Sequence, residues 1–219
     1  MPGPEGGEPG GEDDLDAGGF SAWLAGMEEA LAGRRAADVP CGTCTACCTS
    51  SQFVLVGPDE VDTLAHIPRR LLFPAPRLPR GHVVLGYDER GHCPMLVEGR
   101  CSIYEHRPRT CRTYDCRVFP AAGVEADDDK PLIAARARRW RFRHPAPDDR
   151  ALHDAVRAAA AFVEGHAGDL PEEAAPRNRT QQAVLAVEVH RPFVGGAAPG
   201  PEAVRVEISR RRRGDPRPG

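Results

Sequence analysis

The sequence predicts an α+β fold: a small cysteine-rich domain of short strands and helices, a helical C-terminal extension and disordered termini. Three observations predict it. All eight cysteines of the 219-residue chain lie between positions 41 and 116. Within that window, short apolar runs alternate with Gly- and Pro-containing turns, which is typical of short elements. Apolar residues recur at helical spacing before the window, from Phe20, and after it, from Leu152.

The N-terminal part of the chain divides into a polar segment and a helix. Residues 1–19 consist mainly of Gly, Pro and acidic side chains, and we expect them to be disordered. Residues 20–35 are expected to hold an amphipathic helix, because five apolar side chains recur at helical spacing: Phe20, Trp23, Leu24, Met27 and Leu31. The N-terminus lacks the basic and apolar regions of a secretory signal, and no apolar run approaches the ~20 residues that span a bilayer. The expectation is a cytoplasmic protein without a membrane partner.

Residues 36–120 are expected to form the cysteine-rich domain. Strand-forming residues bounded by turn residues predict strands at 52–56 and 82–87 and a hairpin of 93–97 with 100–104. Short helices are expected after Asp59 and after Arg107, where acidic residues or a proline stand in the first turn. The proline-rich stretch 68–80 is expected to be an extended loop.

The remainder is expected to be a mostly helical extension at 121–194 and a disordered Arg/Pro-rich tail at 195–219. Asp148 and Asp149 begin an amphipathic helix that Gly165 ends. Residues 132–142 fit a strand or a helix, and residues 184–189 are expected to add a strand. The four arginines at 210–213 fit a solvated tail better than a nucleic-acid contact, and the formal net charge of −3 favours neither nucleic acid nor an anionic membrane, so nucleic acid is not expected as a partner.

The cysteines form a pattern that predicts metal binding. Four of them occupy the motif C-x-x-C-x-x-C-C, and all eight are candidate ligands: Cys41, Cys44, Cys47, Cys48, Cys93, Cys101, Cys111 and Cys116. In a reducing compartment, clustered cysteines bind metal more often than they form disulfides, although disulfides or redox thiols are the alternative. Converging thiolates repel one another, and a metal cation relieves that repulsion.

The spacing leaves the metal open between zinc and iron. Cysteines at x-x spacing with a remote Cys93-Pro94 resemble ligands of a [4Fe–4S] cluster, whereas zinc sites usually combine two Cys-x2–4-Cys knuckles. Eight thiolates could fill one or two sites. The adjacent Cys47 and Cys48 cannot easily bind the same tetrahedral ion. His92 and His106 are the only histidines considered as auxiliary ligands, and exposure is the favoured interpretation of both.

The cysteine motif and the segment Cys101-Ser-Ile-Tyr-Glu-His-Arg-Pro-Arg-Thr-Cys111-Arg resemble the YkgJ-type cysteine cluster family. The resemblance covers about residues 38–120 and includes every cysteine. It implies a zinc- or iron-chelating domain whose ligands are the eight cysteines, and a relation to flagellin lysine N-methylase. No catalytic residue and no cofactor-binding residue comes with it.

Two further functions compete with simple metal chelation. The resemblance implies a protein-lysine N-methyltransferase as the alternative, so whether the chain is an enzyme is left open. The chain has no G-x-G-x-x-G motif for a nucleotide cofactor, which weakens that alternative. A zinc-stabilised interaction module, with a protein partner of unknown kind, is the third hypothesis.

Overall fold

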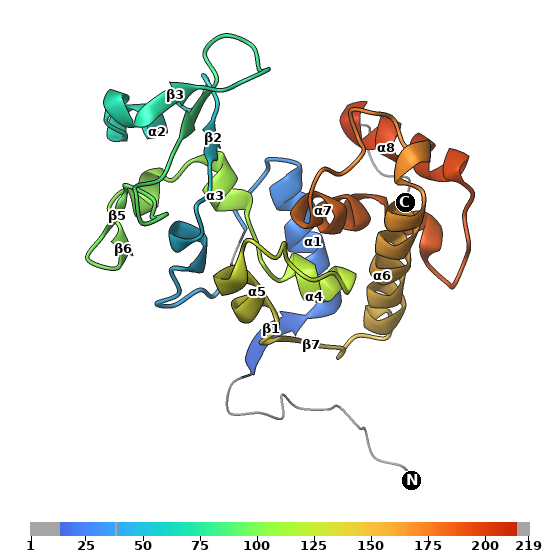
Figure 1. Cartoon of the computed structure of the whole chain (residues 1–219). Coiled ribbons are helices and arrows are strands. Elements are labelled where there is room, and N and C mark those ends of the chain that lie inside the picture. The colour runs from blue at the N-terminus through green and yellow to red at the C-terminus, as the bar shows by residue number, and fades with distance from the viewer. Residues whose placement is uncertain (1–13, 38, 214–219) are drawn as a thin grey trace. The chain divides into compact units, whose positions relative to one another are not determined.

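The computed structural model describes residues 14–37 and 39–213. They divide into two compact units, each treated by itself. The helical unit comprises the chain up to Glu28, Cys116–Asp129 and everything from Ala134 on. The cysteine unit comprises Glu29–Asp115 and Lys130–Ile133. Both contain helices and strands (Figure 1), which confirms the predicted α+β class.

The helical unit begins with a strand that the sequence did not predict. β1 (Leu15–Gly19) pairs in parallel with β7 (Trp140–Arg143), with Leu15 opposite Trp140. The expected disorder of residues 1–19 therefore does not extend to 15–19, and residues 1–13 lie outside the described residues. Composition misled here because the acidic side chain of Asp16 pairs with Arg143 of the partner strand, 3.1 Å away.

The helices of this unit pack around a core of small and branched apolar side chains. The unit contains most of α1 (Phe20–Leu31) and α5 (Pro131–Ala137), and all of α4 (Val118–Ala122), α6 (Asp149–Gly165), α7 (Arg179–Val189) and α8 (Pro201–Arg213). Short 3-10 turns follow α6 at Ala167–Asp169 and α7 at Arg191–Phe193. Phe20, Val156, Val187 and Val204 are completely buried. The predicted helices at 20–31 and 149–165 are confirmed.

Two expectations for the C-terminal half are corrected. Residues 184–189 lie in α7 rather than in a strand, because Asn178 caps that helix by accepting a hydrogen bond from the Gln181 backbone N–H. Residues 201–213 of the expected disordered tail form α8, which buries Val204 and Ile208. Residues 214–219 lie outside the described residues. The ambiguous stretch 132–142 contains both a helix, α5, and the start of β7.

The cysteine unit contains a small antiparallel sheet in the order β2–β4–β3. Its strands are β2 (Val54–Val56), β4 (Val83–Leu85) and β3 (Leu72–Pro74). The strands predicted within 52–56 and 82–87 are confirmed. β3 was missed because the prolines of the stretch 68–80 predicted a loop, but an edge strand tolerates Pro74, which has no N–H.

The remaining elements of the cysteine unit are short. They are α2 (Val61–His66), α3 (Arg109–Thr113), the hairpin β5 (Leu96–Val97) with β6 (Arg100–Cys101), and 3-10 helices at Ala46–Thr49, Arg69–Leu71 and Tyr104–His106. Six buried side chains form the core of the unit: Val54, Val56, Ile67, Leu85, Met95 and Ile103. Cys93, Cys101 and Cys111 pack against this core. A core this small usually needs a further cross-link to be stable. In the described part of the chain, no helix has both the length and the apolar run needed to cross a bilayer.

Candidate metal centre

Four half-buried thiols of the cysteine unit come from separate segments of the chain. Cys48 lies in the 3-10 helix Ala46–Thr49, Cys93 precedes β5, Cys101 ends β6 and Cys111 lies in α3. Within every pair among these four, ionisation of one thiol raises the pKa of another. Such effects act over several ångströms, so the four thiols share one electrostatic environment and are called the four-thiol group.

Backbone hydrogen bonds hold the first two segments of this group together. The Cys93 N–H donates to the Cys48 carbonyl over 2.7 Å, and the Ser51 N–H donates to the Gly91 carbonyl over 2.9 Å. The Lys130 ammonium donates to the Ser50 carbonyl over 3.0 Å. The C-terminal end of the cysteine motif is thereby fixed against the turn that carries Cys93.

The turn after Cys93 supplies backbone N–H groups that stabilise a negative charge on the Cys93 sulfur. The backbone N–H groups of Met95 and Leu96 donate to the Cys93 thiol and lower its pKa, although burial outweighs them and the pKa stays raised. Leu96 stands opposite Cys101 in the β5–β6 hairpin. A single hairpin therefore presents two of the four sulfurs, one of them with backbone donors aimed at it.

α3 carries Cys111 and is anchored by a buried carboxylate. Glu60 accepts the Gly57 N–H through Oε1 over 2.8 Å and the Arg109 N–H through Oε2 over 2.5 Å. The Thr110 hydroxyl donates to the Leu55 carbonyl over 2.8 Å. These contacts attach α3 to β2 and to the turn before α2, which fixes the position of Cys111 relative to the sheet.

The electrostatics of the four-thiol group favour protonated thiols unless a cation is bound. Burial, followed by the neighbouring thiols, raises the pKa of Cys48 to about 11 and that of Cys111 to about 12. Arg107 opposes the rise in the pKa of Cys111. A metal ion that replaces the protons would remove both the desolvation cost and the mutual repulsion.

The donor set fits a thiolate-bound metal. Four convergent thiolates are the ligands of structural zinc sites and of iron–sulfur clusters. Directly after Cys111, the Arg112 guanidinium lies 3.8 Å from the buried Glu60 carboxylate.

Three other cysteines lie at the edge of this group. Cys41 and Cys47 are exposed and Cys44 is half-buried. The Cys44 N–H donates to the Cys41 carbonyl over 3.0 Å, and both thiols contribute to the raised pKa of Cys48. The cysteine motif therefore places Cys48 inside the four-thiol group and its first cysteines beside it.

The structure places Cys116 differently from the other seven cysteines. It belongs to the helical unit, where it is buried and accepts a hydrogen bond from Trp140 Nε1 over 3.2 Å. No local pattern indicated this environment, because Trp140 stands 24 positions away and its indole N–H needs an acceptor when buried.

The two histidines considered as auxiliary ligands have different surroundings. The backbone N–H of His92 donates to Asp88 Oδ1 over 2.8 Å, which shapes the turn before Cys93. His106 contacts Asp62 and stacks on His66. Asp62 and His66 were not predicted as site residues, since 44 positions separate Asp62 from His106 and no motif joins the three.

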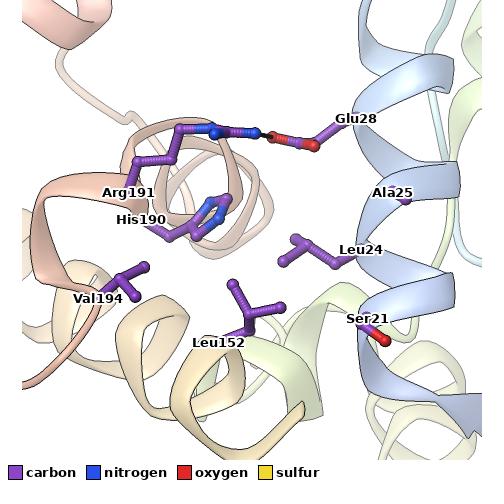
Figure 2. A pocket seen from close by; sticks show the side chains of 8 residues that line it. All are labelled: Ser21, Leu24, Ala25, Glu28, Leu152, His190, Arg191 and Val194. Carbon is purple, nitrogen blue, oxygen red and sulfur yellow. Dashed lines mark ion pairs between the residues drawn. The ribbon is translucent and has the colours of Figure 1, made fainter. Parts of the chain in front are cut away.

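The helical unit has a pocket of its own, of about 490 Å³ (Figure 2). Its lining combines apolar side chains with a buried charged group: Ser21, Leu24, Ala25, Glu28, Leu152, His190, Arg191 and Val194. Arg191 lies 3.7 Å from the buried Glu28 carboxylate. Burial lowers the pKa of His190, whose Nδ1 contacts the Val187 carbonyl over 2.7 Å.

Residues 40–132 match the family model CxxCxxCC, which is described as "Putative zinc- or iron-chelating domain". The matched segment holds all eight cysteines, and the match confirms the resemblance to a zinc- or iron-chelating cysteine cluster domain. No curated protein and no solved structure matches the chain.

Proposed function

Since residues 40–132 match a CxxCxxCC metal-chelating domain, we propose that its centre is one four-thiolate site formed by Cys48, Cys93, Cys101 and Cys111. The observation that supports this proposal is that Cys93, Cys101 and Cys111 pack on one small core while a backbone hydrogen bond joins Cys48 to Cys93. The centre links the cysteine motif, the hairpin and α3. It therefore stabilises a unit whose apolar core is small.

The metal is zinc or iron, and the surroundings suit either. Four thiolates around Zn²⁺ carry a net charge of −2, as does an oxidised [4Fe–4S] cluster with four thiolate ligands. The N–H groups of Met95 and Leu96 and the cation of Arg107 are placed to reduce that charge. Zinc would make the centre purely structural, whereas an iron–sulfur cluster would add electron transfer.

The outer cysteines are proposed to hold a second and more weakly bound ion. Cys41, Cys44 and Cys47 provide three thiols beside Cys48, which is already a ligand of the first centre. Exposure of Cys41 and Cys47 leaves their ion open to water and to chelators. This assignment also agrees with the difficulty of binding one ion through the adjacent Cys47 and Cys48.

Metal analysis of cysteine variants tests the assignment. Zinc, iron and acid-labile sulfide are quantified per chain in anaerobically purified protein and in four Cys→Ser variants at positions 48, 93, 101 and 111. Each variant should lose most of the tightly bound metal. Cys116→Ser is the matched control and should keep it, because Cys116 serves Trp140 in the helical unit. Full metal content in the four variants, or its loss in Cys116→Ser, would refute the assignment.

The alternative function, protein-lysine N-methylation, rests on the resemblance alone. Incubation of the metal-loaded protein with a lysine-containing protein and a methyl donor tests it, with methyl-lysine detected by mass spectrometry. Methyl transfer that Cys48→Ser abolishes would establish the enzyme. If no methyl-lysine is detected, metal chelation remains the proposed function.

A further inference from the structure

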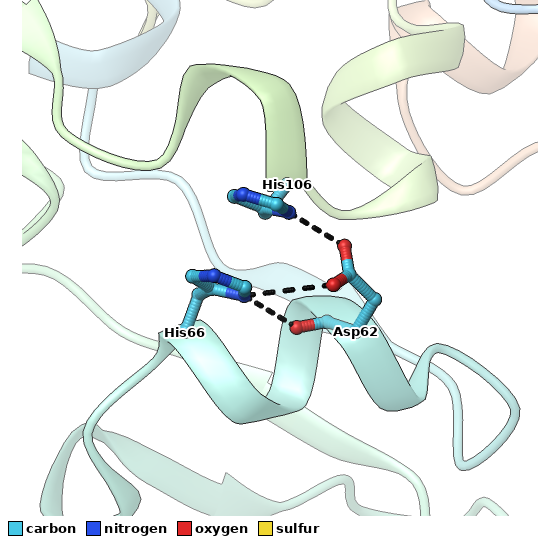
Figure 3. Close-up of side chains that lie close together, drawn as sticks. All are labelled: Asp62, His66 and His106. Atoms are coloured by element: carbon cyan, nitrogen blue, oxygen red, sulfur yellow. Dashed lines mark hydrogen bonds and ion pairs between the residues drawn. The ribbon is translucent and has the colours of Figure 1, made fainter.

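We propose that Asp62, His66 and His106 form a second kind of metal site in the cysteine unit, an open site for a borderline divalent ion such as Zn²⁺ or Fe²⁺. It uses none of the cysteines. Figure 3 shows both imidazole rings turned toward the Asp62 side chain. The ligand atoms of the three residues all lie within 4.8 Å of one another.

The two elements that supply the ligands meet side by side. Asp62 and His66 stand four positions apart in α2, so they share one face of that helix. His106 ends the 3-10 helix Tyr104–His106, and its ring stacks on that of His66 with 3.5 Å between centroids and 6° between planes. Backbone structure, rather than a chance meeting of long side chains, thus brings the two imidazoles together.

The distances between the histidine nitrogens and the Asp62 oxygens lie close to those between two ligand atoms on one ion. Zinc–nitrogen and zinc–oxygen bonds of about 2.0–2.2 Å place adjacent ligand atoms about 3–3.5 Å apart. His106 Nδ1 lies 2.6 Å from Asp62 Oδ2, and His66 Nδ1 lies 3.8 Å from Asp62 Oδ1. The two distances bracket the required range, and the stacked, nearly parallel rings must separate and turn so that both nitrogens point at the ion. His66 Nδ1 would exchange its 2.8 Å contact with the Asp62 carbonyl for the ion.

The donor set indicates the class of ion. Two imidazoles and a carboxylate suit zinc and ferrous iron, and three protein ligands leave positions for water or another small ligand. The side chains of all three residues are solvent-accessible, with 71% of the Asp62 side chain exposed. Its nitrogen and oxygen ligands are harder than the four thiolates of the proposed centre, and they are more accessible to solvent. An ion bound to them should therefore exchange much faster.

Titration of the purified, metal-containing protein with Zn²⁺ tests the proposal. Isothermal calorimetry should show binding that Asp62→Asn and His106→Asn each weaken by more than ~10-fold, the range seen when even outer-shell partners of a metal are lost. The histidine ring resonances of His66 and His106 should shift together as Zn²⁺ is added. His82→Asn is the matched control: it removes a partly exposed histidine of the same unit and should leave this binding unchanged.

The outcome is separable from that of the four-thiolate proposal. Reactivity of the cysteines toward a disulfide reagent reports the thiolate centre and should be the same in wild type, Asp62→Asn and His106→Asn. The proposal is wrong if the resonances of His66 and His106 do not shift when Zn²⁺ is added to wild type. It is also wrong if Asp62→Asn and His106→Asn both bind Zn²⁺ as tightly as wild type does. Circular dichroism of the variants checks that these surface substitutions leave the fold intact.

Discussion

At the scale of single residues, the helical unit contains a buried histidine whose surroundings disfavour its protonated form. His153 is buried, stacks on Phe20 with 4.2 Å between ring centroids, and has Nδ1 2.9 Å from His144 Nε2. Burial, followed by the positive charge of Arg157, lowers the pKa of His153 to about 4. The pKa of His144 is lowered as well, mainly by burial.

These shifts predict that folding stability falls as pH drops from about 6.5 to about 4. In that window the unfolded chain binds more protons at His153 than the folded chain does, so the free energy of unfolding rises with pH. Urea unfolding at pH 7.5 and pH 5 should show a smaller pH effect in His153→Gln than in wild type.

His166→Gln is the matched control for this experiment. His166 also stacks on a phenylalanine, Phe162, with 4.1 Å between ring centroids, but it is only half-buried. The effect of His166→Gln on the pH dependence is the baseline against which that of His153→Gln is compared. An unchanged pH effect in His153→Gln would contradict the role given to burial.

At the scale of elements, Glu60 determines where α3 holds Cys111. Replacement by Ala would leave the Gly57 and Arg109 N–H groups without their acceptor. We expect Glu60→Ala to cost about 2–4 kcal/mol of stability, as expected for two hydrogen bonds to a buried charge. The same variant should bind the four-thiolate metal more weakly. Chemical unfolding and metal competition measure the two effects.

The neighbouring acid is a suitable control. Asp59 also pairs with Arg109, through its guanidinium, but the Asp59 side chain is exposed. Asp59→Ala should therefore affect stability and metal binding far less than Glu60→Ala. Equal effects of the two variants would show that surface charge, rather than the buried anchor, positions α3.

The elements also show how far sequence patterns reach. Local signals were sufficient for α6 and for the β5–β6 hairpin, where spacing and turn residues determine the structure. They failed for β1 and β3, whose strand character depends on partners at β7 and β4. They failed again at 184–189, where branched side chains favour a strand but the Asn178 cap and burial produce a helix.

The candidate site was also predictable from the sequence only in part. The cysteine motif pointed to a metal-chelating domain, and the family model matched by residues 40–132 agrees with it. It could not indicate which thiols lie near one another, nor that Cys116 would accept a hydrogen bond from Trp140 in the helical unit. Nothing in the sequence indicated that Asp62, His66 and His106 form a cluster, because α2 comes close to His106 only in the folded chain.

At the scale of the whole molecule, the two units should respond differently to metal removal. The cysteine unit has a core of six apolar residues with three cysteines packed on it, whereas the core of the helical unit contains no proposed ligand. A strong chelator should speed hydrogen exchange of β2, β4 and α3 by more than ~10-fold, while α6 and α7 keep their protection. Equal loss in both units, or none in either, would contradict a metal that stabilises the cysteine unit alone.

The central claim is that four sulfurs surround one metal, and X-ray absorption at the edge of the bound metal tests it most directly. Protein carrying a single tightly bound centre should show a first shell of sulfur only, at ~2.3 Å if the metal is zinc. Cys111→Ser should reduce that shell or lose the metal. A first shell dominated by nitrogen and oxygen would contradict the four-thiolate centre.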